Sequence, residues 1–224
     1  MTYWFYDFSR GVLWFFFRLG FGLEVRGQKH VPTTGPVLIA CNHVSYLDPP
    51  VLGAACPRRL GFMARATLFE SPGLGAFMRG VHVIPLQRGE HDVGAIREAV
   101  RRLHRGEAIA IFPEGGRQFS GALGTAKRGV GLLAETGRAP IVPAVIDGTF
   151  EALPPHTRRL HRTKIRVAFG PQIPYTTSPT PTPAPDEPVA AHETVEQASR
   201  HRHEALAARV TEQWHRLRAQ LIHG

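Results

Sequence analysis

The fold of this chain is organised around residues 37–49, which read VLIACNHVSYLDP. The apolar run that opens this stretch predicts a buried β-strand ending at Asn42 and His43. Asp48 follows His43 after four residues. An ionised Asp48 can accept a hydrogen bond from one ring nitrogen of His43, which fixes the tautomer and leaves the other nitrogen free to take a proton. Alternatively, the two side chains only cap the helix that follows.

Apolar runs and helical patterns alternate along the rest of the chain. Strands are predicted at residues 36–40, 60–64, 81–86, 108–112, 141–146 and 164–169, and helices at residues 49–55, 74–78 and 91–103 and within residues 125–136. This alternation predicts an α/β fold with a mostly parallel central sheet flanked by helices. A proline-rich linker is predicted at residues 176–190, and a long amphipathic helix within residues 191–224.

Composition narrows the class of protein. The chain has 224 residues, 43% of them hydrophobic and 20% charged, which predicts one globular α/β domain at residues 31–175 with terminal additions. The formal net charge of +9 favours nucleic acid, an anionic membrane surface or phosphate-bearing substrates as partners. The two cysteines, Cys41 and Cys56, are too few for a disulfide framework. Cys41 is a candidate nucleophile, although a buried hydrophobic role is commoner for a cysteine at a strand end.

Residues 1–30 are predicted to form a membrane-associating helical segment. They include Trp4, Trp14 and three consecutive phenylalanines at residues 15–17. Charged residues interrupt the segment, so no uncharged run is long enough to span a bilayer. Dense aromatic residues with interspersed arginines are typical of a helix that lies in the membrane interface. The alternative is a helix packed on the protein's own core.

A second group of candidate residues, PEGGR at residues 113–117, follows the predicted strand at 108–112. In α/β sheets, ligands bind outside the carboxyl ends of the strands, and glycines let a ligand approach the backbone closely. Arg117 offers a planar fork suited to a phosphate. Glu114 can accept a hydrogen bond from a substrate hydroxyl or hold Arg117 in place. Arg88 follows another predicted strand in the same way, unless both arginines are ordinary surface residues.

Four segments of the chain together resemble the signature blocks of the glycerophospholipid acyltransferase family. These are Asn42-His43-x4-Asp48, the strand at residues 83–88, FPEGGR at residues 112–117 and the Val-Pro strand at residues 141–146, in the family's order. The resemblance covers residues 36–148. Two departures stand out: Gly116 occupies a position where the family usually has Thr or Ser, and Gly80 is farther from Arg88 than the family's usual glycine.

The resemblance implies an O-acyltransferase of phospholipid biosynthesis. Such an enzyme moves a fatty acyl group from acyl-CoA or acyl-carrier protein to the sn-2 hydroxyl of 1-acyl-glycerol-3-phosphate, giving phosphatidic acid. The resemblance makes His43 the catalytic base and Asp48 its orienting partner. It assigns glycerophosphate binding to Arg88, Glu114, Gly115 and Arg117. Because the substrate hydroxyl is the nucleophile, neither a metal nor a cofactor is expected, and the acyl thioester is a co-substrate.

The resemblance also implies a peripheral or monotopic position on the cytoplasmic face of the cell membrane, with a lysophospholipid acceptor. Another acceptor, such as a lyso-ornithine lipid, another lysophospholipid or glycerol 3-phosphate, is an alternative that the motifs do not separate. A non-enzymatic basic membrane- or nucleic-acid-binding protein is a further alternative. The basic residues are dispersed and form no nucleic-acid-binding motif, so no nucleic acid partner is expected.

Overall fold

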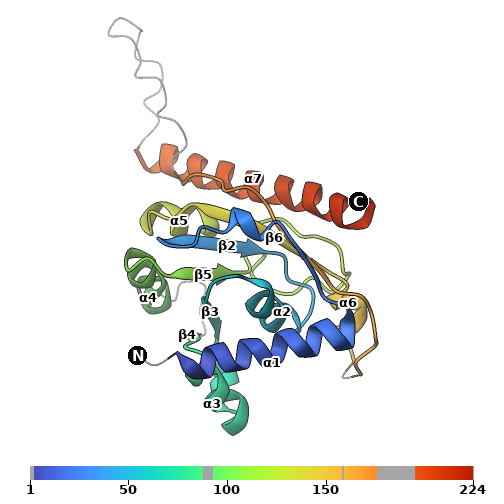
Figure 1. Cartoon of the computed structure of the whole chain (residues 1–224). Coiled ribbons are helices and arrows are strands. Elements are labelled where there is room, and N and C mark those ends of the chain that lie inside the picture. Colours follow the sequence, from blue (N-terminus) through green and yellow to red (C-terminus); the bar gives the residue numbers. More distant parts are fainter. Residues whose placement is uncertain (1–2, 88–92, 158, 176–194, 224) are drawn as a thin grey trace, which may run out of the picture.

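In the computed structural model, the described residues form a seven-stranded sheet with helices on both faces (Figure 1). The description covers residues 3–87, 93–157, 159–175 and 195–223, so the predicted linker at 176–190 lies outside it. Across the sheet, the strands are β1 (Glu24–Arg26), β7 (Arg166–Phe169), β6 (Ile141–Asp147), β2 (Val37–Cys41), β5 (Ala108–Ile111), β3 (Leu60–Arg65) and β4 (Ile84–Leu86). Among these strands only β6 and β7 pair antiparallel, so the α/β fold with a mostly parallel sheet is confirmed.

The middle of the sheet is the three strands β5, β2 and β6. All five residues of β2 are buried, as expected for an apolar run in a parallel strand covered on both faces. Ala40 pairs with Ile111 of β5 on one side and with Pro143 of β6 on the other. Because the three strands run in parallel, the residues that follow them meet at one edge of the sheet, and His43 and Glu114 are among these residues.

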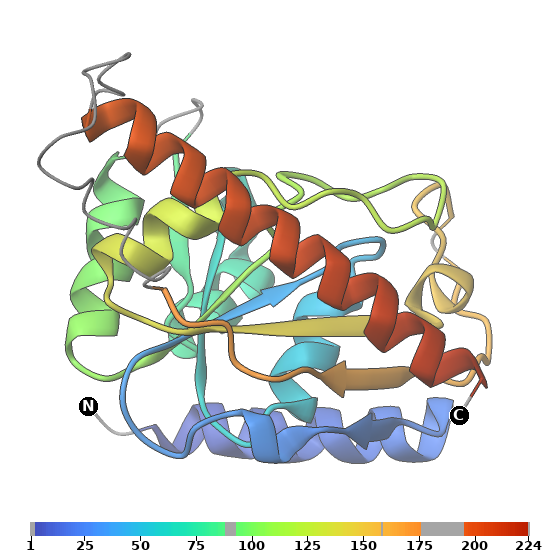
Figure 2. The same cartoon turned by 90° about the horizontal axis from the view of Figure 1, so that it is seen from above.

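Two layers of helices cover the sheet. On one face lie α1 (Trp4–Phe21) and α2 (Asp48–Ala55), whose apolar side chains join a buried cluster with β2, β5 and β6. On the other face lie α4 (Val93–His104), α5 (Gly129–Thr136) and α7 (Val195–His223), which bury a second cluster. Figure 2 shows α7 crossing this face diagonally. The predicted C-terminal amphipathic helix is thus present, with Leu206, Val210 and Trp214 buried against the sheet.

Short elements complete the chain and account for the differences from the predicted boundaries. These are η1 (Gln28–His30), η2 (Ala66–Glu70), α3 (Pro72–Gly80) and α6 (Thr149–Ala152), and none of η1, η2, α6 or β1 was predicted. The strand predicted at 81–86 begins only at Ile84, because α3 runs to Gly80 and His82 has a positive φ of 58°. The helix predicted within residues 125–136 is confirmed as α5, which runs from Gly129 to Thr136 and ends at Gly137 as expected.

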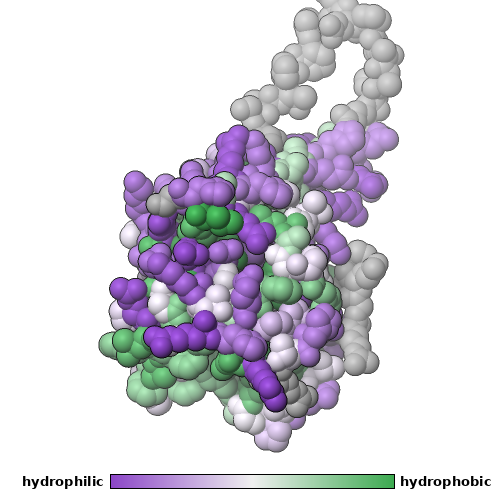
Figure 3. Space-filling model, turned by 90° about the vertical axis from the view of Figure 1, so that its right-hand side faces the viewer, coloured by the Kyte–Doolittle hydropathy of each residue, from purple (hydrophilic) through white to green (hydrophobic). Residues whose placement is uncertain are grey.

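The N-terminal helix α1 packs on the protein's own core along one face and exposes apolar side chains along the other, and its binding to a membrane stays a prediction. One face packs on the core through Phe17 and Phe21, and the Tyr6 hydroxyl accepts a hydrogen bond from the Leu60 N–H at 2.8 Å. The other face leaves large apolar side chains exposed, namely Trp4, Phe8, Val12, Trp14, Phe15, Phe16 and Leu19. Hydrophobic residues accordingly gather over the lower part of the molecule in Figure 3, where Figure 1 places α1 and α3.

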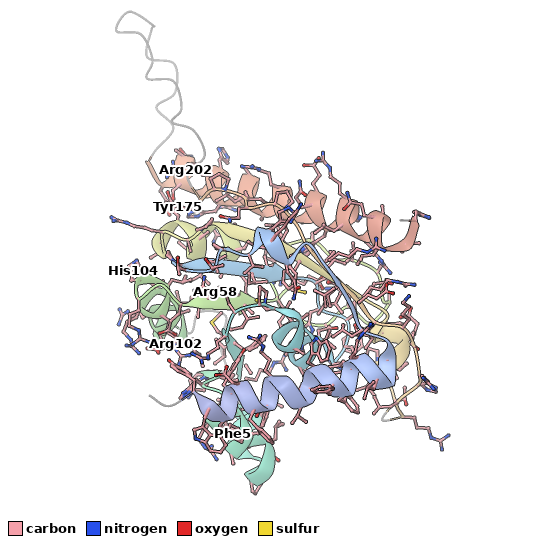
Figure 4. The ribbon with its side chains drawn as sticks, viewed as in Figure 1. Phe5, Arg58, Arg102, His104, Tyr175 and Arg202 are labelled. Atoms are coloured by element: carbon pink, nitrogen blue, oxygen red, sulfur yellow. The ribbon has the colours of Figure 1, made fainter. Side chains whose placement is uncertain are left out.

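The exposed apolar surface continues from α1 onto α3. Phe5 projects from α1 towards α3 (Figure 4), and its ring lies edge-on to Phe77 with 6.1 Å between centroids. Leu68, Leu74 and Phe77 are themselves exposed. We call the exposed apolar side chains of α1, η2 and α3 the apolar face. Within the described part of the chain, no helix has the length and apolar character needed to cross a membrane.

Candidate active site

Asp48 is the buried centre of the candidate site. It begins α2, and its side chain has no exposed surface. Oδ2 accepts hydrogen bonds from the backbone N–H groups of Val44 and Ser45, both at 2.7 Å, and from Nδ1 of His43 at 2.8 Å. Oδ1 accepts from the Thr149 hydroxyl at 2.6 Å. These donors satisfy a buried, ionised carboxylate, which would otherwise be costly to remove from water.

His43 is held so that its second ring nitrogen is available. Because an ionised Asp48 can only accept, Nδ1 of His43 carries the proton and Nε2 is left as a base. The imidazole stacks on Phe112 with ring centroids 4.3 Å apart, and the side chain is 18% exposed. Within the described residues, nothing hydrogen-bonds to Nε2. The first turn of α2 has no side-chain cap, so the interpretation of His43 and Asp48 as helix caps is wrong.

Contacts across the sheet fasten this strand end in place. The Asn42 side chain donates to the Ile146 carbonyl at 3.0 Å and accepts from the Ile146 N–H at 2.8 Å, which ties the end of β2 to β6. The Ser45 hydroxyl donates to the Leu153 carbonyl at 2.9 Å. The site is therefore built on the ends of neighbouring strands and on α6, which are rigid supports for a base and its partner.

The turn after β5 brings Glu114 to the same edge of the sheet. Gly115 has a φ of 79°, a conformation that glycine adopts without steric cost. Glu114 is buried, and its Oε1 accepts from the backbone N–H of His43 at 3.4 Å, while Oε2 has no partner among the described residues. Burial raises the pKa of the Glu114 carboxyl above its ordinary value, although the nearby donor groups of Gln118, His43 and Gly124 partly oppose this.

Arg117 lies over an aromatic ring beside this turn. Its guanidinium carbon is 3.6 Å from the centroid of the Tyr46 ring. Its Nη1 is buried without a hydrogen-bond partner in the described part of the chain. No ion pair joins Arg117 to Glu114 there, so the predicted role of Glu114 in holding Arg117 is wrong. A buried guanidinium donor without a partner is costly in isolation, and its chemistry suits a phosphate or carboxylate ligand.

Two polar residues at this site, Lys127 and Thr149, were not predicted from the sequence. A Cβ atom on Gly115 would lie 2.8 Å from Nζ of Lys127, so the Lys127 ammonium sits directly over the glycine turn. A basic residue shortly after PEGGR was the available signal for Lys127. Thr149 bonds to Asp48 across 101 positions of sequence, and no local pattern announces such a contact.

The other roles considered from the sequence are a cysteine nucleophile, a metal site and a phosphate contact by Arg88. Burial raises the pKa of the Cys41 thiol well above its ordinary value, so Cys41 stays a neutral thiol and is a poor nucleophile. In the described ranges, no cluster of three or more His, Cys, Asp or Glu side chains could hold a metal ion. Arg88 lies outside the described residues, and its predicted role stays a prediction.

An apolar cavity of about 570 Å³ adjoins the site. Its lining includes Phe112, which stacks on His43, and Tyr46, whose ring lies under the Arg117 guanidinium. It also includes Phe62 of β3 and Tyr6 of α1, which bonds to the start of β3. The cavity therefore extends along β3 from the His43 end of the sheet towards α1 and the apolar face.

The fold and these residues define an α/β protein with an oriented histidine base, a cationic turn and an apolar cavity at one edge of its sheet. The family described as Acyltransferase matches residues 22–147, which is more than half of the chain. This chain belongs to that acyltransferase family. The predicted resemblance to glycerophospholipid acyltransferases is thereby confirmed, and the non-enzymatic alternative is set aside.

Individual relatives agree with this assignment. The 1-acyl-sn-glycerol-3-phosphate acyltransferase of Bacillus subtilis is 31% identical over 144 residues, covering 64% of this chain and 71% of the relative. Human 1-acyl-sn-glycerol-3-phosphate acyltransferase alpha is 30% identical over 158 residues, covering 69% of this chain and 56% of the relative. The crystal structure of the acyltransferase PlsC from Thermotoga maritima covers 93% of this chain, with a TM-score of 0.67 and 20% identity, and shares the fold. This chain covers 77% of the PlsC chain.

Proposed function

We propose that this acyltransferase moves a fatty acyl group from acyl-CoA or acyl-carrier protein to the sn-2 hydroxyl of 1-acyl-glycerol-3-phosphate, giving phosphatidic acid. The observation that carries the proposal is the pairing of an oriented base with an unpaired cation at one edge of the sheet. His43 is fixed by Asp48, and Arg117 keeps a buried donor without a protein partner. A hydroxyl-bearing phosphate ester is a substrate class that needs both groups.

In the proposed mechanism, Nε2 of His43 takes the proton of the acceptor hydroxyl as its oxygen attacks the thioester carbonyl. Asp48 stabilises the imidazolium that forms, in the way a triad aspartate does. Collapse of the tetrahedral intermediate breaks the carbon–sulfur bond, and the imidazolium returns the proton to the leaving thiolate. The products are an ester and a free thiol. The thioester already carries an activated acyl group, so the proposed reaction requires neither a metal nor a cofactor.

The acceptor phosphate is proposed to bind at the glycine turn. Arg117 can bind it through paired N–H donors, and the ammonium of Lys127 lies over Gly115. The exposed backbone of the turn allows close approach, and Glu114 is placed to accept a hydrogen bond from the glycerol moiety. We retain Arg88 as a further proposed phosphate contact. The acyl chain is proposed to occupy the apolar cavity beside Phe112.

We further propose that the protein binds the cytoplasmic face of the cell membrane peripherally through the apolar face. Deleting α1 would also strip Phe17 and Phe21 from the core, so surface substitutions test this better. The triple variant Phe8→Ser, Phe15→Ser, Leu19→Ser should float less with vesicles of zwitterionic and anionic phospholipid, while Ile222→Ser, exposed on α7, should float normally. Complete release of the unaltered protein by high salt would instead make the attachment electrostatic.

The direct test of the reaction is thiol release from palmitoyl-CoA by the purified protein, with and without lysophosphatidic acid. We expect acceptor-dependent thiol release and formation of phosphatidic acid, both abolished in His43→Ala, which should lose about 10²–10⁴-fold in turnover. Replacing palmitoyl-CoA by palmitoyl-acyl-carrier protein identifies the donor. Near wild-type transfer by folded His43→Ala would contradict the mechanism.

A panel of acceptors distinguishes the remaining alternatives. Lyso-ornithine lipid lacks the phosphate, whereas glycerol 3-phosphate keeps it but lacks the first acyl chain. Because Arg117 and Lys127 favour an anionic group and the apolar face favours a lipid, lysophosphatidic acid should have the highest kcat/KM of the panel. A higher value for lyso-ornithine lipid would reassign the acceptor while leaving the acyl-transfer chemistry intact.

A further inference from the structure

The segment between β5 and α5, residues 112–128, carries Glu114, Arg117 and Lys127 but has no helix or strand of its own. Two backbone hydrogen bonds hold this segment within the candidate active site. The Gln118 N–H donates to the His43 carbonyl at 2.7 Å, and the Lys127 N–H donates to the Pro113 carbonyl at 2.9 Å. An irregular segment needs further support if its side chains are to hold a fixed geometry.

That support comes from α7, which runs beside the segment in Figure 2. The Thr211 hydroxyl accepts a hydrogen bond from the Ala126 N–H at 2.9 Å and donates to the Ala207 carbonyl at 3.1 Å. Two helical turns further on, Arg218 donates to the Gly121 carbonyl at 3.4 Å. These contacts join residues 85 and 97 positions apart in sequence, and they hold the second half of the irregular segment at Gly121 and Ala126.

The helix that makes these contacts is itself fixed to the sheet. Trp214 lies between Thr211 and Arg218 on the same face, is fully buried, and donates its indole N–H to the Ala40 carbonyl at 3.0 Å. Nearer the start of the helix, His203 and Arg202 both pair with Glu135 of α5; Figure 4 labels Arg202. A shift of α7 would therefore have to break contacts with both β2 and α5.

We propose that α7 is a brace for the acceptor-binding segment and that Thr211 is a positioning residue for the acceptor phosphate. The proposal rests on the proposed function. Thr211 fixes Ala126, the next residue Lys127 bonds back to Pro113, and Pro113 precedes Glu114. The Thr211 hydroxyl thus positions the backbone on both sides of the segment, at Ala126 directly and at Pro113 through Lys127. It does so without contacting the substrate.

The test compares Thr211→Val with Thr211→Ser in the full-length protein. Valine keeps the shape of threonine but leaves the Ala126 N–H without its acceptor, whereas serine retains the hydroxyl. We expect Thr211→Val to raise the KM for lysophosphatidic acid about three- to tenfold, the range that follows from one lost hydrogen bond. The kcat and the KM for palmitoyl-CoA should change less than about twofold, as should all constants of Thr211→Ser.

A second readout is independent of catalysis. Hydrogen exchange of peptides that cover residues 113–128 should be faster in Thr211→Val than in the wild type, and restored in Thr211→Ser. Glu212→Gln is the matched control, because it changes the next residue of α7 and affects only an exposed ion pair with Arg216. It should alter neither exchange nor KM.

The outcomes separate this inference from the proposed function. If the wild type transfers no acyl group to lysophosphatidic acid, the proposed function fails, while exchange still tests the brace. An unchanged acceptor KM in Thr211→Val, with active wild type, overturns the positioning role. Equal losses in donor KM, acceptor KM and melting temperature would also overturn it, because they would make Thr211 a purely structural residue.

Discussion

The replacement Asp48→Asn isolates the charge of the carboxylate from its hydrogen bonds. The asparagine oxygen can occupy the position of Oδ2 and keep the bonds from His43, Val44 and Ser45. The asparagine NH2 then faces the Thr149 hydroxyl, which can rotate to accept instead of donating. The His43 tautomer is preserved in this arrangement, so the main loss is the negative charge that stabilises the imidazolium.

The expected loss of activity follows from that single change. A hydrogen bond to a charged group contributes about 1.5–3 kcal/mol, and each 1.36 kcal/mol changes a rate about tenfold. Asp48→Asn should therefore lower kcat roughly 10- to 150-fold, which is less than the loss in His43→Ala. Asp48→Ala should behave differently, because it strands the buried N–H groups of Val44 and Ser45 and lowers the free energy of unfolding by about 2–6 kcal/mol.

The assay is thiol release at saturating concentrations of both substrates, paired with urea unfolding of each variant. The reasoning predicts that Asp48→Asn is nearly as stable as wild type but slow, and that Asp48→Ala is unstable. Full turnover in Asp48→Asn would refute the role of the charge. Equal loss of stability in both variants would refute the hydrogen-bond assignment.

Three further predictions concern the turn after β5. Arg117→Ala should raise the acceptor KM by about one to two orders of magnitude, because a charge-assisted contact contributes about 1.5–3 kcal/mol; impaired use of acyl-CoA alone would move Arg117 to the donor site. Glu114→Gln should be more stable than wild type at neutral pH, where the buried carboxyl with its raised pKa must ionise, and this advantage should vanish as the pH falls to the unfolded pKa of glutamate; a constant difference across pH in urea unfolding would contradict it. Gly116→Ser should fold with a melting temperature within a few degrees of wild type, because a Cβ there meets nothing within 4 Å; a large loss of stability would show that the turn requires glycine.

The sequence could predict what is local. The strand β2 and the helix α2 follow from an apolar run and a proline-marked helix start, and the spacing of His43 and Asp48 announced their contact. The strand order was not predictable in this way, because it depends on which strands pack together in the finished sheet. The contacts of His43 with Glu114 and of Asp48 with Thr149 follow from that order, and their partners are 71 and 101 positions apart.

The same distinction holds for the terminal helices. Their apolar faces were predictable from periodicity, and the buried side chains of α7 follow that pattern. Thr211 interrupts no pattern and looks like any polar residue on a helix. Its importance depends on the irregular segment that lies against it, and the path of such a segment is set by contacts distant in sequence.

The two adjacent glycines of the turn, Gly115 and Gly116, differ in whether the backbone explains why glycine is present. Gly115 has a φ of 79°, a backbone conformation that other residues rarely adopt, so the turn itself favours glycine there. Gly116 has no positive φ, although the family usually carries Thr or Ser there. The backbone therefore does not explain Gly116. A Cβ at Gly116 would meet no other atom within 4 Å, so the fold leaves room for the side chain that the family usually carries there.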